Sequence, residues 1–129
     1  MGLSYIKIFV KHLKICVQLN ANDQMVLFMQ GRYLLSFHLL DDNEKKSLTE
    51  YLGHMPECDI GEAEVKLKKS MELNPNFIDN YITLAYLLIK RQKLDEAKVV
   101  VEKGLKVERN NKSDEEIAKE LEKINDSLG

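Results

Sequence analysis

With 129 residues, 44% of them hydrophobic, and a net charge of −2, the chain is long enough for one domain around one buried core. Its charges are uneven, since residues 1–38 carry four Lys or Arg against one acid, and the rest carries 15 against 20. No stretch is concentrated enough in Lys and Arg to form a basic face, which argues against a nucleic-acid-binding domain.

The cysteines and the N-terminal segment indicate the compartment. Cys16 and Cys58 are too few for a disulfide framework, and reduced thiols predict a cytoplasmic or nuclear protein. The opening segment is not a secretory signal, because Lys7, Lys11 and Lys14 interrupt its apolar run. Its basic amphipathic character also fits a membrane surface, but burial in a helical stack is the preferred interpretation.

Two helices are expected in the first third of the chain. The first covers residues 4–19, and a polar turn at 20–23 separates it from a second helix over residues 24–38. The apolar face of the first helix consists of Ile8, Phe9, Leu13, Cys16, Val17 and Leu19.

A long polar segment, residues 39–60, then separates the second helix from a third at 61–73. Gly53 and Pro56 interrupt this insertion, and a short helix fits within residues 44–52. Insertions of this length either carry function or are simply mobile loops, and the sequence leaves both open.

Residues 74–108 show the clearest pattern, which predicts two amphipathic helices joined by a short polar turn. Asn76 is the expected N-cap of the first of these helices, and the basic run at 90–93 marks its end. The two apolar stripes comprise Ile78, Tyr81, Ile82, Leu84, Ala85, Leu88 and Ile89, then Leu94, Ala97, Val100, Val101, Gly104, Leu105 and Val107.

Small residues stand where the two helices should touch. Glycine inside a helix costs about 1 kcal/mol relative to alanine, so Gly104 predicts a neighbour too close for a β-carbon. Ala85 and Ala97 fit the same close packing. The alternative is a glycine tolerated by accident on the surface.

A final charged helix is expected at 113–127, with Ser113 and Glu116 as a capping box. Its narrow apolar stripe consists of Ile117, Leu121, Ile124 and Leu128. A polar helix of this kind suits the end of a helical stack, where it covers the last core face.

The spacing within residues 74–108 resembles one unit of the tetratricopeptide repeat (TPR) family. A weaker likeness pairs residues 24–38 with 61–73, and residues 4–19 match half a repeat. A fainter likeness, through residues 31–34 and 63–75, is to Strap-like TPR cofactors. The residues that carry the main resemblance are Tyr81, Leu84, Ala85, Leu88, Ala97, Val101, Gly104 and Leu105.

The resemblance implies a single all-α domain over residues 1–129. It would be a short right-handed superhelix of TPR-type hairpins, with a helical insertion at 39–60 and a C-terminal capping helix. In this family the first helix of each hairpin lines a concave groove. On this chain the groove positions are Met25, Phe28, Met29, Arg32, Leu35, Asp79, Ile82, Thr83, Tyr86, Ile89 and Lys90.

These positions are mostly apolar, so the implied function is a scaffold or adaptor that binds a partner peptide or amphipathic helix. A co-chaperone clamp for acidic tails is disfavoured, because Arg32 is the one deep cation and Asp79 would repel a carboxylate. Two alternatives stay open. The insertion or the terminal helices cover the groove, or the chain has a structural role, as a fragment of a larger TPR solenoid or as a homodimer.

No constellation typical of catalysis or of cofactor binding is present in the sequence. His12, His38 and His54 are far apart, and His54, Glu57 and Cys58 have no second ligand pair at zinc-like spacing. Phosphate-binding loops and nucleophile elbows are also missing from the sequence. We therefore expect no enzymatic activity, no cofactor and no metal.

Overall fold

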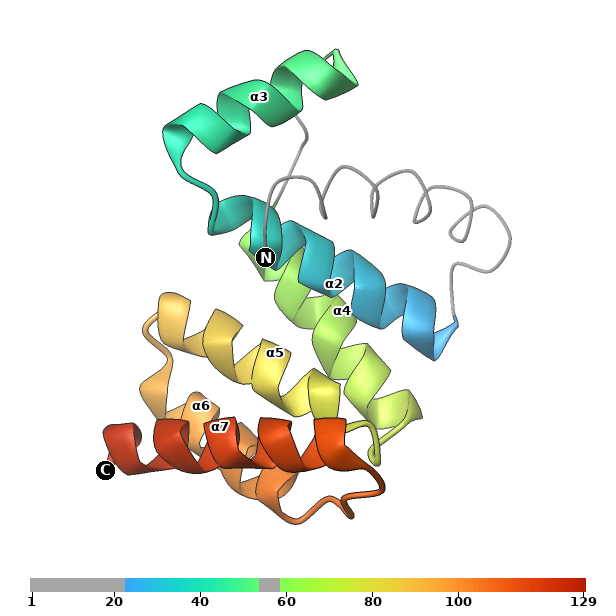
Figure 1. Cartoon of the computed structure of the whole chain (residues 1–129), viewed down its shortest axis with the longest axis vertical. Coiled ribbons are helices and arrows are strands. Elements are labelled where there is room, and N and C mark those ends of the chain that lie inside the picture. The colour runs from blue at the N-terminus through green and yellow to red at the C-terminus, as the bar shows by residue number, and fades with distance from the viewer. Residues whose placement is uncertain (1–22, 54–58) are drawn as a thin grey trace. The chain divides into compact units, whose positions relative to one another are not determined.

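The computed structural model describes residues 23–53 and 59–129 (Figure 1). Throughout this part of the chain the regular secondary structure is helical, which confirms the all-α prediction. The helix expected at 4–19 lies outside the described residues, and the right-handed superhelix stays a prediction. The helices are α2 (Gln24–His38), α3 (Asp42–Leu52), α4 (Ile60–Leu73), α5 (Ile78–Lys90), α6 (Leu94–Leu105) and α7 (Lys112–Leu128).

The chain divides into two compact units, Met1–Lys66 and Leu67–Gly129. The division falls inside α4, so the first half of this helix belongs to unit 1 and its second half to unit 2. The predicted single domain over residues 1–129 stays a prediction.

In unit 1, local side-chain contacts define the ends of α2 and α3. The Asp23 carboxylate caps α2, accepting hydrogen bonds from the backbone N–H groups of Met25 and Val26 at 2.9 and 3.2 Å. Asp41 and Glu44 form a capping box at the start of α3, with distances of 2.7 and 3.3 Å. Helix α3 ends at Gly53, whose positive φ of 79° suits glycine.

The segment expected as an insertion thus contains a packed helix, which begins two residues before the predicted 44–52. The apolar residues Phe37 and Leu40 at the end of α2 form a buried cluster with Leu48 of α3, and Tyr33 and Leu52 pack against it. This apolar contact holds α3 against the C-terminal end of α2.

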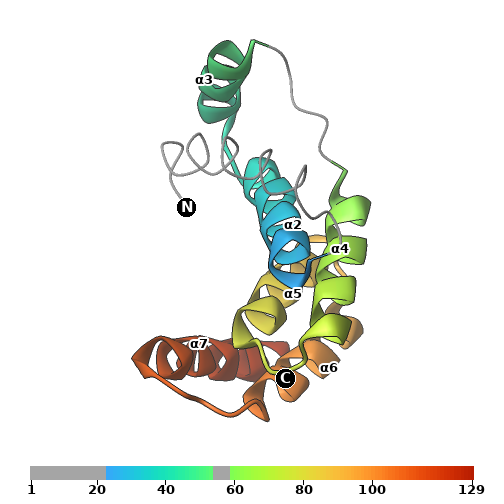
Figure 2. The same cartoon turned by 90° about the vertical axis from the view of Figure 1, so that its right-hand side faces the viewer.

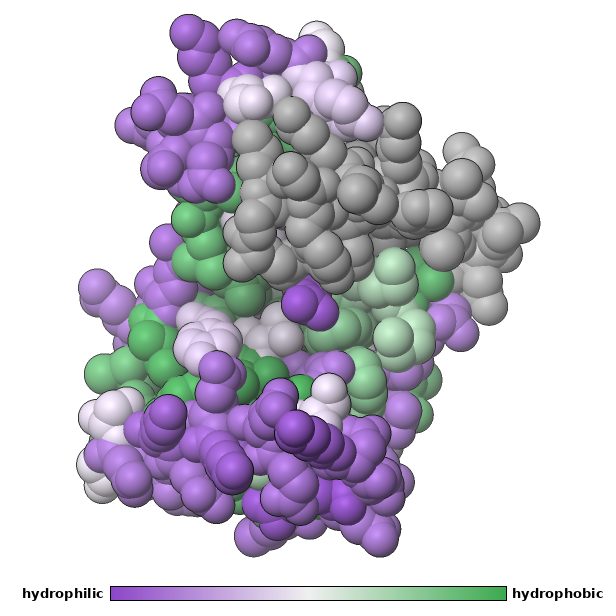
Figure 3. All heavy atoms as spheres, viewed as in Figure 1, coloured by the Kyte–Doolittle hydropathy of each residue, from purple (hydrophilic) through white to green (hydrophobic). Residues whose placement is uncertain are grey.

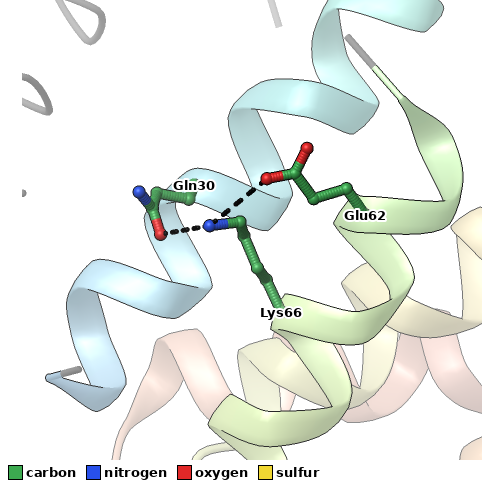
Figure 4. A network of polar contacts seen from close by, with 3 residues as sticks. All are labelled: Gln30, Glu62 and Lys66. Atoms are coloured by element: carbon green, nitrogen blue, oxygen red, sulfur yellow. Dashed lines mark hydrogen bonds and ion pairs between the residues drawn. The ribbon is translucent and has the colours of Figure 1, made fainter. Parts of the chain in front are cut away.

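A polar network connects α2 with the first half of α4 (Figure 4). The ammonium group of Lys66 lies 3.0 Å from the Gln30 side-chain oxygen and 3.6 Å from the Glu62 carboxylate. The Lys66 side chain is only 23% exposed, but that of Glu62 is 56% exposed, so solvent still screens this ion pair. Gln30 contributes a direct polar contact between α2 and α4.

In unit 2, residues 74–108 form the predicted helical hairpin. Helices α5 and α6 are joined by a tight turn in which Gln92 adopts a φ of 61°. The expected N-cap at Asn76 is wrong, because α5 begins at Ile78 after Phe77, which makes no side-chain capping bond. The Asn76 backbone N–H instead donates to the side chain of Asn74 at 3.3 Å, which closes a local turn.

The close helix contact predicted at Gly104 is confirmed. A β-carbon on Gly104 would lie 2.7 Å from the Cβ of Tyr81 in α5 and 3.0 Å from a methyl carbon of Leu121 in α7. Ala85 and Ala97 are also fully buried. Helices α5, α6 and α7 pack together (Figure 2), and Gly104 lies where they meet. The alternative of a glycine tolerated by accident on the surface is therefore wrong.

Helix α7 begins one residue earlier than predicted, and its cap is a different residue. The Asn111 side chain accepts a hydrogen bond from the Asp114 N–H at 2.8 Å, so Asn111 is the N-cap. The predicted Ser113–Glu116 capping box is wrong, because Ser113 already lies within the helix. Of the predicted apolar stripe, Leu121 and Ile124 are buried, whereas Ile117 and Leu128 are half-buried; Ala118, which was not predicted, is buried with them.

Candidate functional site

One face of α5 contains all six of the candidate residues predicted on this helix. Ile82 is buried at 8% exposure, whereas Tyr86 is 44% exposed. The other four are half-buried or exposed. We call the accessible part of this face the α5 edge, defined as Asp79, Thr83, Tyr86, Ile89 and Lys90. Spacings of three and four residues place its members in one line along the helix.

Tyr86 connects the α5 edge to α7. Its hydroxyl donates a hydrogen bond to a carboxylate oxygen of Glu120 at 3.4 Å. Burial raises the pKa of Tyr86, and the negative charge of Glu120 and this hydrogen bond raise the pKa further. The hydroxyl therefore stays protonated at neutral pH and remains a donor. The predicted site did not include Glu120, although it flanks the predicted apolar stripe on α7.

Tyr81 holds the start of α5 in place beneath this edge. Its hydroxyl donates to the backbone carbonyl of Pro75 at 2.6 Å, and its Cβ lies against Gly104. Burial raises the pKa of Tyr81 above its usual value. The α5 edge is therefore positioned by one contact at its N-terminal end and by the hairpin packing along its length.

The surface next to the α5 edge is strongly polar on α7. Figure 3 shows a hydrophilic face over α7, with hydrophobic atoms adjoining it at the level of α5. The exposed charged residues of α7 include Glu115, Glu116, Lys119, Glu120, Glu122, Lys123 and Asp126. A partner at the α5 edge would thus meet an apolar and aromatic strip beside a charged helix.

The candidate residues on α2 belong to unit 1. Met25 is 43% exposed, Met29 and Arg32 are half-buried, and Phe28 and Leu35 are buried. Arg32 is engaged in interactions of its own. Since the two candidate sets lie in different units, the prediction that they line one groove stays a prediction.

The titratable residues of the described ranges show no metal-binding arrangement. Within residues 23–53 and 59–129, no group of three or more His, Cys, Asp or Glu side chains is arranged to hold a metal ion. His12, Cys16, His54, Glu57 and Cys58 lie outside these ranges. Among the helices described, none is both long and apolar enough to cross a membrane.

Comparison with known proteins identifies a family. The family model "Regulator of microtubule dynamics protein 1-3" matches residues 3–129. Regulator of microtubule dynamics protein 2 from Rattus norvegicus is 30% identical over 122 residues, covering 94% of this chain and 30% of that protein. The Mus musculus and Homo sapiens proteins are 29% and 28% identical, over 94% and 98% of this chain. The chain spans about 30% of the length of these relatives.

This finding corrects the resemblance drawn from spacing. The predicted membership of the TPR family, and of its Strap-like branch, is wrong, because the matching family is a different one. The physical reason is that small residues at helix contacts are required by any close helical hairpin and are not specific to one family. The chain belongs to the family of regulator of microtubule dynamics proteins 1–3.

Proposed function

We propose that this chain is a protein-binding module that acts in the control of microtubule dynamics and meets its partner through the α5 edge. The relatives are named for regulation of microtubule dynamics and not for an enzymatic reaction. Regulation of a protein polymer requires contact with the polymer or with proteins bound to it. A role of this kind also implies a cytoplasmic location.

The exposure of Tyr86 on the surface of α5 is the observation that carries the proposal. Tyr86 is a large aromatic side chain, 44% exposed, on a helix whose other large apolar residues are mostly buried. Tyrosine is enriched among residues that dominate binding energy at interfaces, since it offers a wide apolar surface with a polar tip. The helix is held by the contacts of Tyr81 and Gly104, so it loses little conformational freedom when a partner binds.

The neighbours of Tyr86 indicate what the partner would offer. Ile89 is half-buried and Lys90 is exposed at the C-terminal end of the same helix. An apolar side chain packed on Tyr86 and Ile89, with an acidic group facing Lys90, would match this strip. The partner is therefore an amphipathic helix or peptide of a microtubule-associated protein or of tubulin.

The test compares the full chain with Tyr86→Ser and with Lys90→Glu, in pull-down and microtubule co-sedimentation. Val99→Ser is the matched control, because Val99 is 50% exposed on α6, outside the α5 edge. We expect Tyr86→Ser to weaken binding by about thirtyfold, as at a typical interface hot spot, with helicity by circular dichroism unchanged. Equal binding by wild type and both α5 variants would overturn the proposal.

The homodimer alternative is measured on the same samples. Size-exclusion chromatography with light scattering reports the mass of the wild-type chain and of Tyr86→Ser. A wild-type dimer that Tyr86→Ser converts to monomer would mean that the α5 edge binds a second copy of the chain.

A further inference from the structure

Helix α7 is seated on α5 and α6 at Gly104, and this contact defines a second surface. We propose that this surface, the α7 seat, is a binding site for an amphipathic helix of a partner protein, and that α7 blocks it when docked. The α7 seat is defined as the surface that α5 and α6 present to α7 around Tyr81 and Gly104. The inference rests on the proposed protein-binding function but uses a different surface from the α5 edge.

The geometry of the α7 seat specifies its occupant. A methyl carbon of Leu121 lies 3.0 Å from the position that a β-carbon on Gly104 would take, so the missing side chain creates the hollow that Leu121 fills. Leu121 is fully buried, and Ala118 and Ile124, three residues to either side, are buried with it. Recognition of a helix in a groove uses anchors at this spacing. The fitting helix has a central leucine, a small residue before it and a β-branched residue after it.

Helix α7 buries a smaller share of its residues than α5 and α6 do. Only three of its 17 residues are buried, compared with eight of 13 in α5. A helix with so few buried apolar side chains opens locally at lower free energy than the core. Its hydrogen bond to α5, from Tyr86 to Glu120, is exposed and long at 3.4 Å.

Release of α7 would leave a direct contact between α5 and α6 in place. The segment before α7 is largely exposed at Glu108, Asn110 and Asn111, and the N-cap at Asn111 moves with the helix. The contacts between α5 and α6 include Tyr81 against Gly104, which does not require α7. The docked α7 thus acts as an internal competitor that reduces the apparent affinity of any partner helix for the seat.

The experiment uses the full chain and a fluorescent 17-residue peptide with the sequence of α7. Leu121→Asp removes the central anchor, so α7 should leave and the seat should become free. We expect this variant to bind the peptide at least about tenfold more tightly than wild type by fluorescence anisotropy. Glu122→Lys, at the exposed neighbouring position, should behave like wild type. A peptide carrying the same Leu-to-Asp change should bind neither protein.

Hydrogen exchange on the wild-type chain provides a second measurement that does not depend on the folding of a variant. We expect the amides of α7 to exchange faster than those of α5 and α6, and excess peptide to accelerate exchange in α7. Exchange in α7 as slow as in α5, or equal peptide binding by Leu121→Asp and wild type, would overturn the inference. These assays contain no microtubules, so their failure is distinguishable from failure of the proposed function at the α5 edge.

Discussion

The contact between Gly104 and Tyr81 shows how a single residue determines the distance between helices. The 2.7 Å separation concerns two β-carbons, which are fixed to their backbones. No side-chain rotation can relieve such a contact, so any larger residue at 104 must push α5 and α6 apart. The buried methyl group of Leu121 at 3.0 Å closes the same space from α7.

Gly104→Ala should therefore destabilise the chain, although alanine is the better helix former. Overpacking costs about 1–3 kcal/mol, and a contact between two β-carbons fixed to their backbones falls in the upper part of this range. The gain in helix propensity offsets about 1 kcal/mol of it. We expect a net loss of about 1–2 kcal/mol in the free energy of unfolding, measured by urea denaturation. The exposed neighbour Lys103 supplies the control, since Lys103→Ala should change stability little. A Gly104→Ala chain as stable as wild type would contradict the observed packing.

Helices α2, α3 and α7 begin where a side chain satisfies one or two of the first backbone N–H groups, whereas α5 and α6 begin without such a bond. Asp23 and Asp41 do this for α2 and α3, and Asn111 does it for α7. At α7 two residues compete in the sequence, Asn111 and Ser113. The extended backbone of Asn111, with φ −156° and ψ 177°, lets its side chain reach the Asp114 N–H.

Substitution of Asn111 and of Ser113 should affect the stability of α7 differently. Asn111→Ala should lower the free energy of unfolding by about 1 kcal/mol, the usual cost of losing an N-cap. Ser113→Ala should stay within about 0.5 kcal/mol of wild type, as for an exposed position without a capping role. Thermal and urea unfolding monitored by circular dichroism would measure both. A larger loss for Ser113→Ala than for Asn111→Ala would restore the capping box.

At the scale of the whole molecule, each unit has interior contacts of its own. Unit 1 buries Phe37, Leu40 and Leu48, and unit 2 packs three helices around Gly104. Unit 2 also holds Tyr81 and Tyr86, whose pKa values are both raised. The free energy of unfolding should therefore depend on pH in the alkaline range, where these two residues titrate.

Stability should decline as the pH rises above the usual tyrosine pKa of 10.0. Both tyrosines have a higher pKa in the folded state than in the unfolded state, so the unfolded chain releases their protons at a lower pH. The free energy of unfolding therefore falls as the pH rises, until the pH passes the higher pKa of the folded state. Tyr86→Phe should reduce this alkaline loss, and Glu120→Gln should reduce it by less, since burial of Tyr86 remains. Urea unfolding at about pH 9 to 11 would measure the alkaline loss of stability in each variant. Identical alkaline slopes for wild type and Tyr86→Phe would contradict the assignment.

The sequence by itself determined where most helices lie, because the apolar period is a local property of the chain. The helix at 24–38 and the hairpin at 74–108 follow directly from it. Gly104 was informative for the same reason, since a glycine inside a helix has a known cost that a close contact explains. The resemblance to the TPR family did not hold, because helix contacts of this kind arise in many families.

Only the tertiary structure decided which side chains meet across the helices. Glu120 contacts Tyr86, and Asn80 is fully buried although its amide atoms have no hydrogen-bond partner among the described residues. Neither result follows from the apolar period, because that period predicts which face of a helix is buried but not which residues pack against it. The angle and distance between packed helices select the partners, and here a missing side chain at Gly104 sets that distance.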